Sequence, residues 1–233
     1  MEQQIAAVRQ ALCAIKIIKE DNVPCKIEEG LYLGSLGAAN DKTRLKSLNI
    51  THILTVARAL PPAHPNDFTY KVIAVLDRED VEISQYFDEC FNFIEEGKRV
   101  GGVLVHCYMG RSRSVTVVVS YLMKKHGMGM SEALELVKSK RPLACPNAGF
   151  MLLLQNYEKL LIELGRNLRE RSYSYSPSPP RGYSRRCRSS SSRGHCGGRF
   201  REPPTSLLVR KQPHDCRSDI SAISFLQDHV SYH

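Results

Sequence analysis

The segment from Gly101 to Met123 constrains the fold of this chain more than any other segment. It begins with a short run of β-branched and apolar residues, Val103–Val105, which is typical of a buried strand. After a short loop, a second apolar run, Val115–Met123, is long enough for a buried helix. A strand, a tight loop and a helix in this order direct backbone N–H groups and the positive end of the helix dipole toward one point. The segment therefore predicts an anion-binding loop inside an α/β domain.

The loop between these two runs carries side chains suited to attack on phosphorus. Cys107 stands at its start, and a helix N-terminus with nearby cations favours the thiolate, which is the attacking form. Arg113 has a planar guanidinium that can bind two oxygens of an oxyanion, and Ser114 can donate a hydrogen bond to the sulfur. We expect His106 to hold the Cys107 carbonyl and to tune the thiolate rather than to accept a proton from a substrate. The other residues of the predicted phosphate-binding loop are Tyr108, Met109, Gly110, Arg111 and Ser112.

An alternative is that this cysteine is structural. A buried cysteine after a strand is more often a small apolar core residue, and an isolated Cys-x5-Arg occurs by chance in many chains. Here the whole motif lies between a predicted strand and a predicted helix, which favours the functional interpretation. The motif His106-Cys107-x2-Gly110-x2-Arg113-Ser114 resembles the signature of the cysteine-dependent protein tyrosine phosphatases.

Residues 26–164 resemble the dual-specificity branch of that family, and its small plant members in particular. Two loop positions depart from the family pattern, and both bear on substrate preference. Met109 stands where alanine is common, and Arg111 stands where a small or apolar residue is common. The stretches that carry the resemblance are Gly30–Ser35, Ile50–Val56, Tyr121–Met123 and Arg141–Phe150.

The resemblance implies a fold and a reaction. The fold is α/β, with a central, mainly parallel sheet of about five strands flanked by helices. The reaction is hydrolysis of phosphotyrosine and of phosphoserine or phosphothreonine on proteins, with MAP kinases as expected substrates. It proceeds through a cysteinyl-phosphate intermediate and needs no metal and no cofactor. Two alternatives stay open: a phosphoinositide or phospholipid phosphatase, because Arg111 adds positive charge to the loop, and a non-catalytic phosphoprotein-binding module.

The leaving oxygen of a phosphate ester needs a proton, so a second residue must act as general acid. Asp77 is the first acidic residue after a predicted strand at Tyr70–Val75, and ligands of open α/β sheets bind at the carboxyl ends of the strands. Asp77 also matches the general acid of the resembled family by position. Glu79, Asp80 and Glu82 compete for this role, although a solvated acidic loop explains these three better.

Asn147 is expected to support the site. The resemblance implies that it hydrogen-bonds the phosphate-binding loop, and its position before the last predicted helix suits an N-cap equally well. That helix is predicted over residues 147–164. The other predicted elements are a hairpin over 26–33, a strand over 52–57, and helices over 41–48, 83–98 and 131–138, with Asp41 and Ser131 as caps.

Composition divides the chain into three parts. Residues 1–20 form a predicted amphipathic helix, residues 21–165 the catalytic domain, and residues 166–233 a tail rich in Ser, Arg and Pro. Residues 1–165 contain 20 basic and 19 acidic side chains, whereas residues 166–233 contain 13 basic and five acidic ones. The tail has too few aliphatic residues to offset the entropy of ordering, so it is predicted to be disordered.

The sequence alone leaves the partners of the two terminal segments open. The first helix either docks on the domain or binds a partner, and Arg9, Lys16 and Lys19 give it some likeness to a calmodulin target. The Arg-Ser runs of the tail could bind nucleic acid or acidic partners, and a solvated tail without a dedicated role is equally compatible.

No run of the tail matches a zinc motif, and no apolar run of the chain approaches the ~20 residues of a membrane span. Eight scattered cysteines without a recognisable signal peptide predict a reducing location, cytoplasmic or nuclear.

Overall fold

The computed structural model describes residue 16 and residues 20–174, with their side chains as far as residue 166. Its centre is a five-stranded sheet with the spatial order β1-β2-β5-β3-β4. β1 pairs antiparallel with β2, and all other neighbouring strands are parallel, which confirms the predicted mainly parallel sheet. The strands are β1 (Cys25–Glu28), β2 (Leu31–Gly34), β3 (Ile50–Val56), β4 (Thr69–Ile73) and β5 (Gly102–His106).

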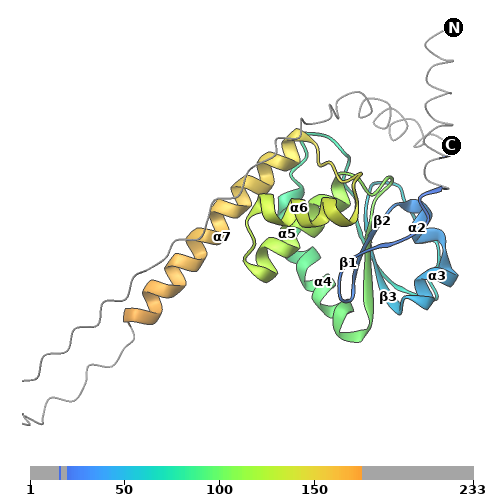
Figure 1. Cartoon of the computed structure of the whole chain (residues 1–233), viewed down its shortest axis with the longest axis horizontal. Helices are drawn as coiled ribbons and strands as arrows, with labels where there is room; N and C mark the ends of the chain where they lie inside the picture. Colours follow the sequence, from blue (N-terminus) through green and yellow to red (C-terminus); the bar gives the residue numbers. More distant parts are fainter. Residues whose placement is uncertain (1–15, 17–19, 175–233) are drawn as a thin grey trace, which may run out of the picture.

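Helices cover both faces of the sheet (Figure 1). Because both faces are covered, the central strands β3 and β5 are nearly continuous runs of buried residues. Helix α5 is buried from its first residue to Met123, since it lies between the sheet and the outer helices. One face carries α2 (Leu36–Asn40) and α3 (Lys42–Ser47), and the other carries α4 (Phe87–Val100), α5 (Arg113–His126), α6 (Met130–Lys140) and α7 (Ala148–Ser174).

Several helical elements differ from the predictions. The helix predicted over 83–98 begins as a 3-10 turn, η1 (Ile83–Tyr86), before it continues as α4. Helix α2 is not predicted at all, because five residues are too few to display a helical period. Helix α6 begins at Met130 rather than after a Ser131 cap, because the Glu158 carboxylate accepts the Met130 N–H at 2.8 Å.

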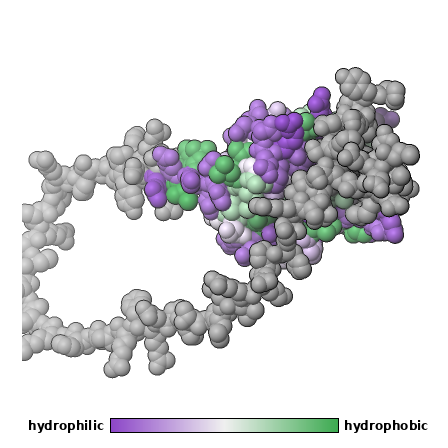
Figure 2. All heavy atoms as spheres, turned by 90° about the horizontal axis from the view of Figure 1, so that it is seen from above, coloured by the Kyte–Doolittle hydropathy of each residue, from purple (hydrophilic) through white to green (hydrophobic). Residues whose placement is uncertain are grey.

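Helix α7 runs past the predicted end of the domain. Its predicted last residue is Leu164, whereas the helix continues to Ser174, into the segment predicted to be disordered. Leucine, arginine and glutamate, which are good helix formers, account for this extension. The helix extends away from the sheet (Figure 1), and Figure 2 shows hydrophobic and hydrophilic surface side by side along the protruding part. Among the described side chains of α7, which end at residue 166, the exposed large apolar ones are Leu152, Leu160, Ile162 and Leu164.

Two predicted segments lie wholly or mostly outside the described residues. The N-terminal helix is described only at Lys16 and Glu20, which are helical and form an ion pair at 3.9 Å. The tail lies outside the description from residue 175 onward. Within the part that the structure describes, no helix is long and apolar enough to cross a membrane.

Candidate active site

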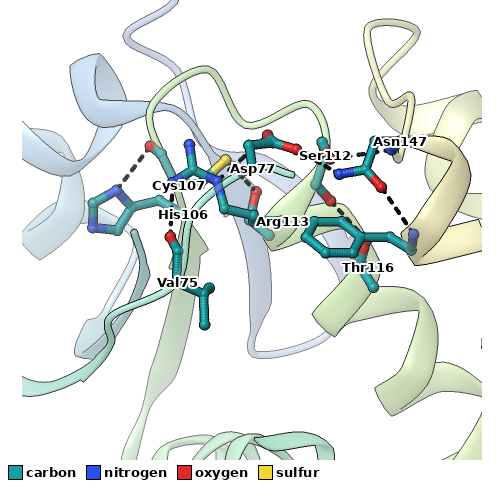
Figure 3. Close-up of polar contacts among 10 residues, drawn as sticks. Val75, Asp77, His106, Cys107, Ser112, Arg113, Thr116 and Asn147 are labelled. Atoms are coloured by element: carbon teal, nitrogen blue, oxygen red, sulfur yellow. Dashed lines mark hydrogen bonds and ion pairs between the residues drawn. The ribbon is translucent and has the colours of Figure 1, made fainter. Parts of the chain in front are cut away.

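The candidate site lies where the carboxyl ends of the parallel strands meet, as expected for an open α/β sheet. Cys107 directly follows β5, and Arg113 begins α5. Asp77 lies in the loop after β4. This strand ends earlier than predicted, because the Val75 carbonyl accepts hydrogen bonds from the Arg58 N–H and from Arg113 instead of a neighbouring strand. Figure 3 shows Cys107, Arg113 and Asp77 grouped at this edge of the sheet.

The backbone carbonyls of the phosphate-binding loop point outward, toward donors that lie outside the loop. Arg141 donates from Nε to the Gly110 carbonyl at 2.6 Å and from Nη2 to the Met109 carbonyl at 2.9 Å. In a trans peptide the N–H opposes the C=O, so the N–H groups of residues 108–112 lie on the inner side of the loop. The remaining pairs are His106 Nδ1 to Cys107 O at 3.3 Å, Leu36 N–H to Tyr108 O at 3.0 Å, and Cys145 N–H to Arg111 O at 2.7 Å.

Gly110 lets the loop approach strand β2. Its φ is +61°, a left-handed conformation that glycine adopts without strain. A Cβ at this position would lie 2.4 Å from the Gly34 carbonyl oxygen, so a larger residue would displace the loop. Among the other loop residues Ser112 is buried, whereas Tyr108, Met109 and Arg111 are half-buried and keep some exposed surface.

The Cys107 sulfur is buried beside a hydrogen-bond donor. The residue is 1% exposed, and Ser114 Oγ donates to its Sγ at 3.2 Å. Cys90 is equally buried but lies in the apolar core, where burial raises the pKa of its thiol to about 12. Of these two buried cysteines, Cys107 is the one with donors suited to a thiolate.

His106 holds the base of the loop as a neutral side chain. Burial lowers the pKa of its imidazole to about 4, and the nearby Arg113 guanidinium acts in the same direction. Because the Cys107 carbonyl can only accept, Nδ1 carries the proton, and Nε2 accepts a hydrogen bond from Thr55 Oγ1 at 2.8 Å. Thr55 stands opposite His106 in the register of β3 and β5. The imidazole therefore acts on the loop through hydrogen bonds and its dipole, not through a positive charge.

Arg113 is a buried cation whose Nε–H has no hydrogen-bond partner among the described residues. The residue is 1% exposed, and Figure 3 shows it grouped with Cys107 and Asp77. Nη1 donates to the Val75 carbonyl at 3.2 Å, and Nε lies 3.4 Å from Asp77 Oδ2. Nε makes no hydrogen bond to any described residue. Since an unpaired buried donor is costly, this nitrogen is suited to bind an anion oxygen.

Asp77 is held by donors from two other segments. Ser112 Oγ and Asn147 Nδ2 donate to its Oδ1 at 2.7 Å and 3.0 Å. Asn147 also caps α7, because its Oδ1 accepts the Phe150 N–H at 2.9 Å. Its own N–H donates to Ser112 Oγ at 3.2 Å. Asn147 therefore serves as a helix cap and as a support of the phosphate-binding loop at the same time (Figure 3).

The carboxylates that compete with Asp77 for the role of general acid lie on the surface. Glu79, Asp80 and Glu82 are exposed, and Asp80 accepts two hydrogen bonds from the Arg78 guanidinium at 2.8 Å and 2.9 Å. The Asp77 side chain is 17% exposed and contacts the phosphate-binding loop. Of these four carboxylates, the structure brings Asp77 to the site.

Arg141 and Asp21 belong to the site, although sequence reasoning places neither there. Arg141 is 2% exposed, and its Nη1 donates to Asp21 Oδ1 at 3.1 Å in addition to its bonds to the loop carbonyls. Its Nη2 forms a second, short contact with Asp21 Oδ2. The signal in the sequence is Arg141-Pro142, which by itself predicts only the end of a helix.

Comparisons with known proteins are consistent with this geometry. The family model "Dual specificity phosphatase, catalytic domain" matches residues 31–160. The chain is 59% identical over 160 residues to dual specificity protein phosphatase 1 of Arabidopsis thaliana, covering 68% of this chain and 81% of that protein. It is 45% identical to MAP kinase phosphatase with leucine-rich repeats protein 3 of Dictyostelium discoideum, over 60% of this chain and 16% of that protein. The crystal structure of DUSP15 matches with a TM-score of 0.59 and 39% identity, covering 64% of this chain and 97% of that chain.

A mainly parallel sheet with a cysteine and an arginine around an amide-lined loop has the architecture of a cysteine-dependent phosphatase. The family match and the identity to the plant relative narrow this class further. The chain belongs to the dual-specificity phosphatase family and is a phosphatase of the hydrolase class. The matched range includes Asp77, Cys107 and Arg113, and residues 161–233 lie outside it.

The low pKa of His106 predicts a pH-dependent stability. The unfolded chain binds a proton on this imidazole below about pH 6.5, whereas the native state binds it only below about pH 4. As pH falls from 6.5 to 4, the unfolding free energy of the wild type should fall by about 3 kcal/mol more than that of His106→Asn. Denaturant titrations measure this difference. Burial also lowers the pKa of His52, but His52 is present in both proteins, so its contribution to the difference cancels. Equal pH dependence in the two proteins would contradict the prediction.

The bonds from Arg141 predict that this residue maintains the shape of the loop. Arg141→Met keeps the length of the side chain but removes its donors to the Met109 and Gly110 carbonyls. Since a misplacement of about 1 Å can cost about 10²-fold, kcat/KM for an aryl phosphate should fall about 10- to 100-fold in steady-state assays. Arg44→Met, which removes an exposed arginine from α3, is the matched control and should retain wild-type kcat/KM. An unchanged kcat/KM in Arg141→Met would show that the loop keeps its shape without these bonds.

Proposed function

We propose that this protein hydrolyses phosphotyrosine and phosphoserine or phosphothreonine side chains of protein substrates, with Cys107 as the nucleophile. The observation that carries the proposal is the outward orientation of the loop carbonyls, which leaves amide donors on the inner side of the loop. The buried Arg113 adds a cationic donor beside Cys107, and family membership supports protein substrates. Together these groups can bind a dianionic phosphate ester and stabilise the charge of its transition state.

In the proposed first step, the Cys107 thiolate attacks phosphorus in line with the ester oxygen. The Sγ–P bond forms while the P–O ester bond breaks, and Asp77 transfers a proton to the leaving oxygen. The loop amides and Arg113 stabilise the three remaining phosphoryl oxygens. Because Ser112 and Asn147 occupy Oδ1 of Asp77, its Oδ2 is the oxygen that carries the transferable proton.

In the proposed second step, water attacks the cysteinyl phosphate. Asp77 accepts a proton from that water, the S–P bond breaks, and inorganic phosphate leaves. Ser114 Oγ, at 3.2 Å from Sγ, stabilises the returning thiolate by donating a hydrogen bond. The cycle ends with an ionised Cys107 and a protonated Asp77, so both groups are ready for the next ester.

MAP kinases are the substrate class that we propose within this chemistry. The support is the Dictyostelium relative, whose name describes a MAP kinase phosphatase and which aligns over 60% of this chain. Tyr108, Met109 and Arg111 are the loop residues that retain exposed surface, so a bound substrate can contact them. A thiolate nucleophile requires a reducing compartment, which suits the cytoplasm or the nucleus.

The nucleophile assignment predicts the behaviour of Cys107→Ser. Its kcat for an aryl phosphate should fall by more than about 10³-fold, because a serine hydroxyl is not ionised at neutral pH. Binding of a phosphotyrosine peptide should persist, because the amides and Arg113 remain. Cys90→Ala removes an equally buried sulfur outside the site and should keep its activity. Near-normal turnover by Cys107→Ser would disprove the assignment.

The substrate class predicts a preference between two phosphate esters. The wild type should hydrolyse a doubly phosphorylated MAP kinase activation-loop peptide with a kcat/KM at least about tenfold above that for a soluble phosphoinositide. Phosphate release measured for both substrates at equal enzyme concentration tests this. A faster reaction with the phosphoinositide would favour the lipid phosphatase, and the Cys107→Ser enzyme serves as the blank for each substrate.

A further inference from the structure

The first turn of α7 contacts the backbone of the loop that carries Asp77. A Cβ built on Gly149 would lie 1.9 Å from the Glu79 carbonyl oxygen and 2.6 Å from both the Glu79 carbonyl carbon and its Cα. Real Cβ atoms essentially never show contacts under 3.0 Å. A residue larger than glycine at this position would therefore separate the helix and the loop by about 1 Å or more.

Nothing in the backbone conformation of Gly149 requires glycine. The residue lies within helix α7, and it is not among the glycines with positive φ. Within a helix, glycine is the least favourable residue apart from proline. The atoms that exclude a side chain belong to the Glu79 backbone, which cannot rotate aside as a flexible side chain does. The close approach of the two segments is therefore the physical reason for glycine here.

The same turn of α7 is tied to both halves of the site. Asn147 donates from its side chain to Asp77 Oδ1 and from its backbone to Ser112 Oγ. The loop from Asp77 to Ile83, which we call the acid loop, is held at its far end by Ile83, whose side chain is fully buried. The loop from Asp77 to Ile83 is thus fixed at both ends, and Gly149 contacts it in between.

We propose that Gly149 is a positioning residue, which sets the distance between the general acid Asp77 and the phosphate-binding loop. The proposal rests on the proposed function, in which Asp77 donates the proton to the leaving oxygen. Asp77 and Glu79 belong to one short loop, so a displacement of the Glu79 backbone moves the carboxyl of Asp77 away from that oxygen. Helix α7 then holds the acid loop in its working position before a substrate binds.

Leaving-group dependence tests this role. For aryl phosphates with a strongly basic leaving group, Gly149→Ala should lower kcat/KM about 10- to 100-fold, since a misplacement of about 1 Å can cost about 10²-fold. Nitro-substituted aryl phosphates have weakly basic leaving groups that need little protonation, so their kcat/KM should fall less than about threefold. Gly165→Ala on the same helix is the matched control, because an added Cβ there meets no atom within 4 Å, and it should match the wild type on both substrates.

Asp77→Asn separates this proposal from the proposed function. Asp77→Asn should show the same leaving-group dependence as Gly149→Ala. Adding Gly149→Ala to Asp77→Asn should change kcat/KM by less than about twofold. An equal loss for both leaving groups in Gly149→Ala, or full additivity in the double variant, would overturn the positioning role and leave the function of Asp77 intact. A wild-type leaving-group dependence in Asp77→Asn would instead overturn the general-acid assignment.

Hydrogen exchange on the wild type tests the proposal even if Gly149→Ala does not fold. Because α7 already holds the acid loop, the amides of residues 79–83 should exchange at the same rate, within about twofold, with and without saturating orthovanadate. Inhibition of aryl phosphate hydrolysis verifies that the orthovanadate is bound. New protection of these amides with orthovanadate would show that the loop closes on the anion, and would overturn the proposal.

Discussion

The outward hydrogen bonds of the loop carbonyls are the constraint on which the rest of the site depends. Successive peptides with N–H groups on one side bring their carbonyls together on the other side, and buried carbonyls without donors are costly. The donors come from separate parts of the fold: His106 in β5, Leu36 in α2, Arg141 after α6 and Cys145 before α7. In the proposed function, the anion site is therefore organised by folding and needs little rearrangement when a phosphate arrives.

Two buried guanidinium groups serve this loop in opposite ways. Arg141 has its charge matched by Asp21 and its donors matched by the Met109 and Gly110 carbonyls, so it stabilises the outside of the loop. Arg113 has Asp77 at 3.4 Å and an Nε without a hydrogen bond to any described residue. A buried cation with incomplete partners destabilises the native state. A phosphate dianion would complete these interactions. The free energy that the unpaired donor costs in the free protein would then add to the affinity for the anion.

Residues that act within one contiguous segment could be predicted from the sequence, and residues that meet through tertiary packing could not. Cys107 and Ser114 lie in one strand-loop-helix unit, so local geometry alone brings them within 3.2 Å. Asp77 could be selected because parallel strands end at the same edge of a sheet. The contact between Arg141 and Asp21 joins positions 120 residues apart and depends on the packing of the whole domain. The short helix α2 escaped prediction, and η1 was predicted only as the start of an α-helix, because neither is long enough to show a period of its own.

Gly149 marks a further limit of sequence reasoning, because a glycine inside a helix indicates only weak local propensity until its neighbour is known. Its neighbour is the acid loop, and the same turn of α7 supplies Asn147 to Asp77 and to Ser112. In the proposed cycle Asp77 must first donate a proton to one oxygen and then accept one from water at nearly the same place. A carboxylate fixed by a helix meets that requirement in both steps without moving. A loop that opened between the steps would have to recover the same position twice in each turnover, so anchoring by α7 suits a two-step reaction at one phosphorus atom.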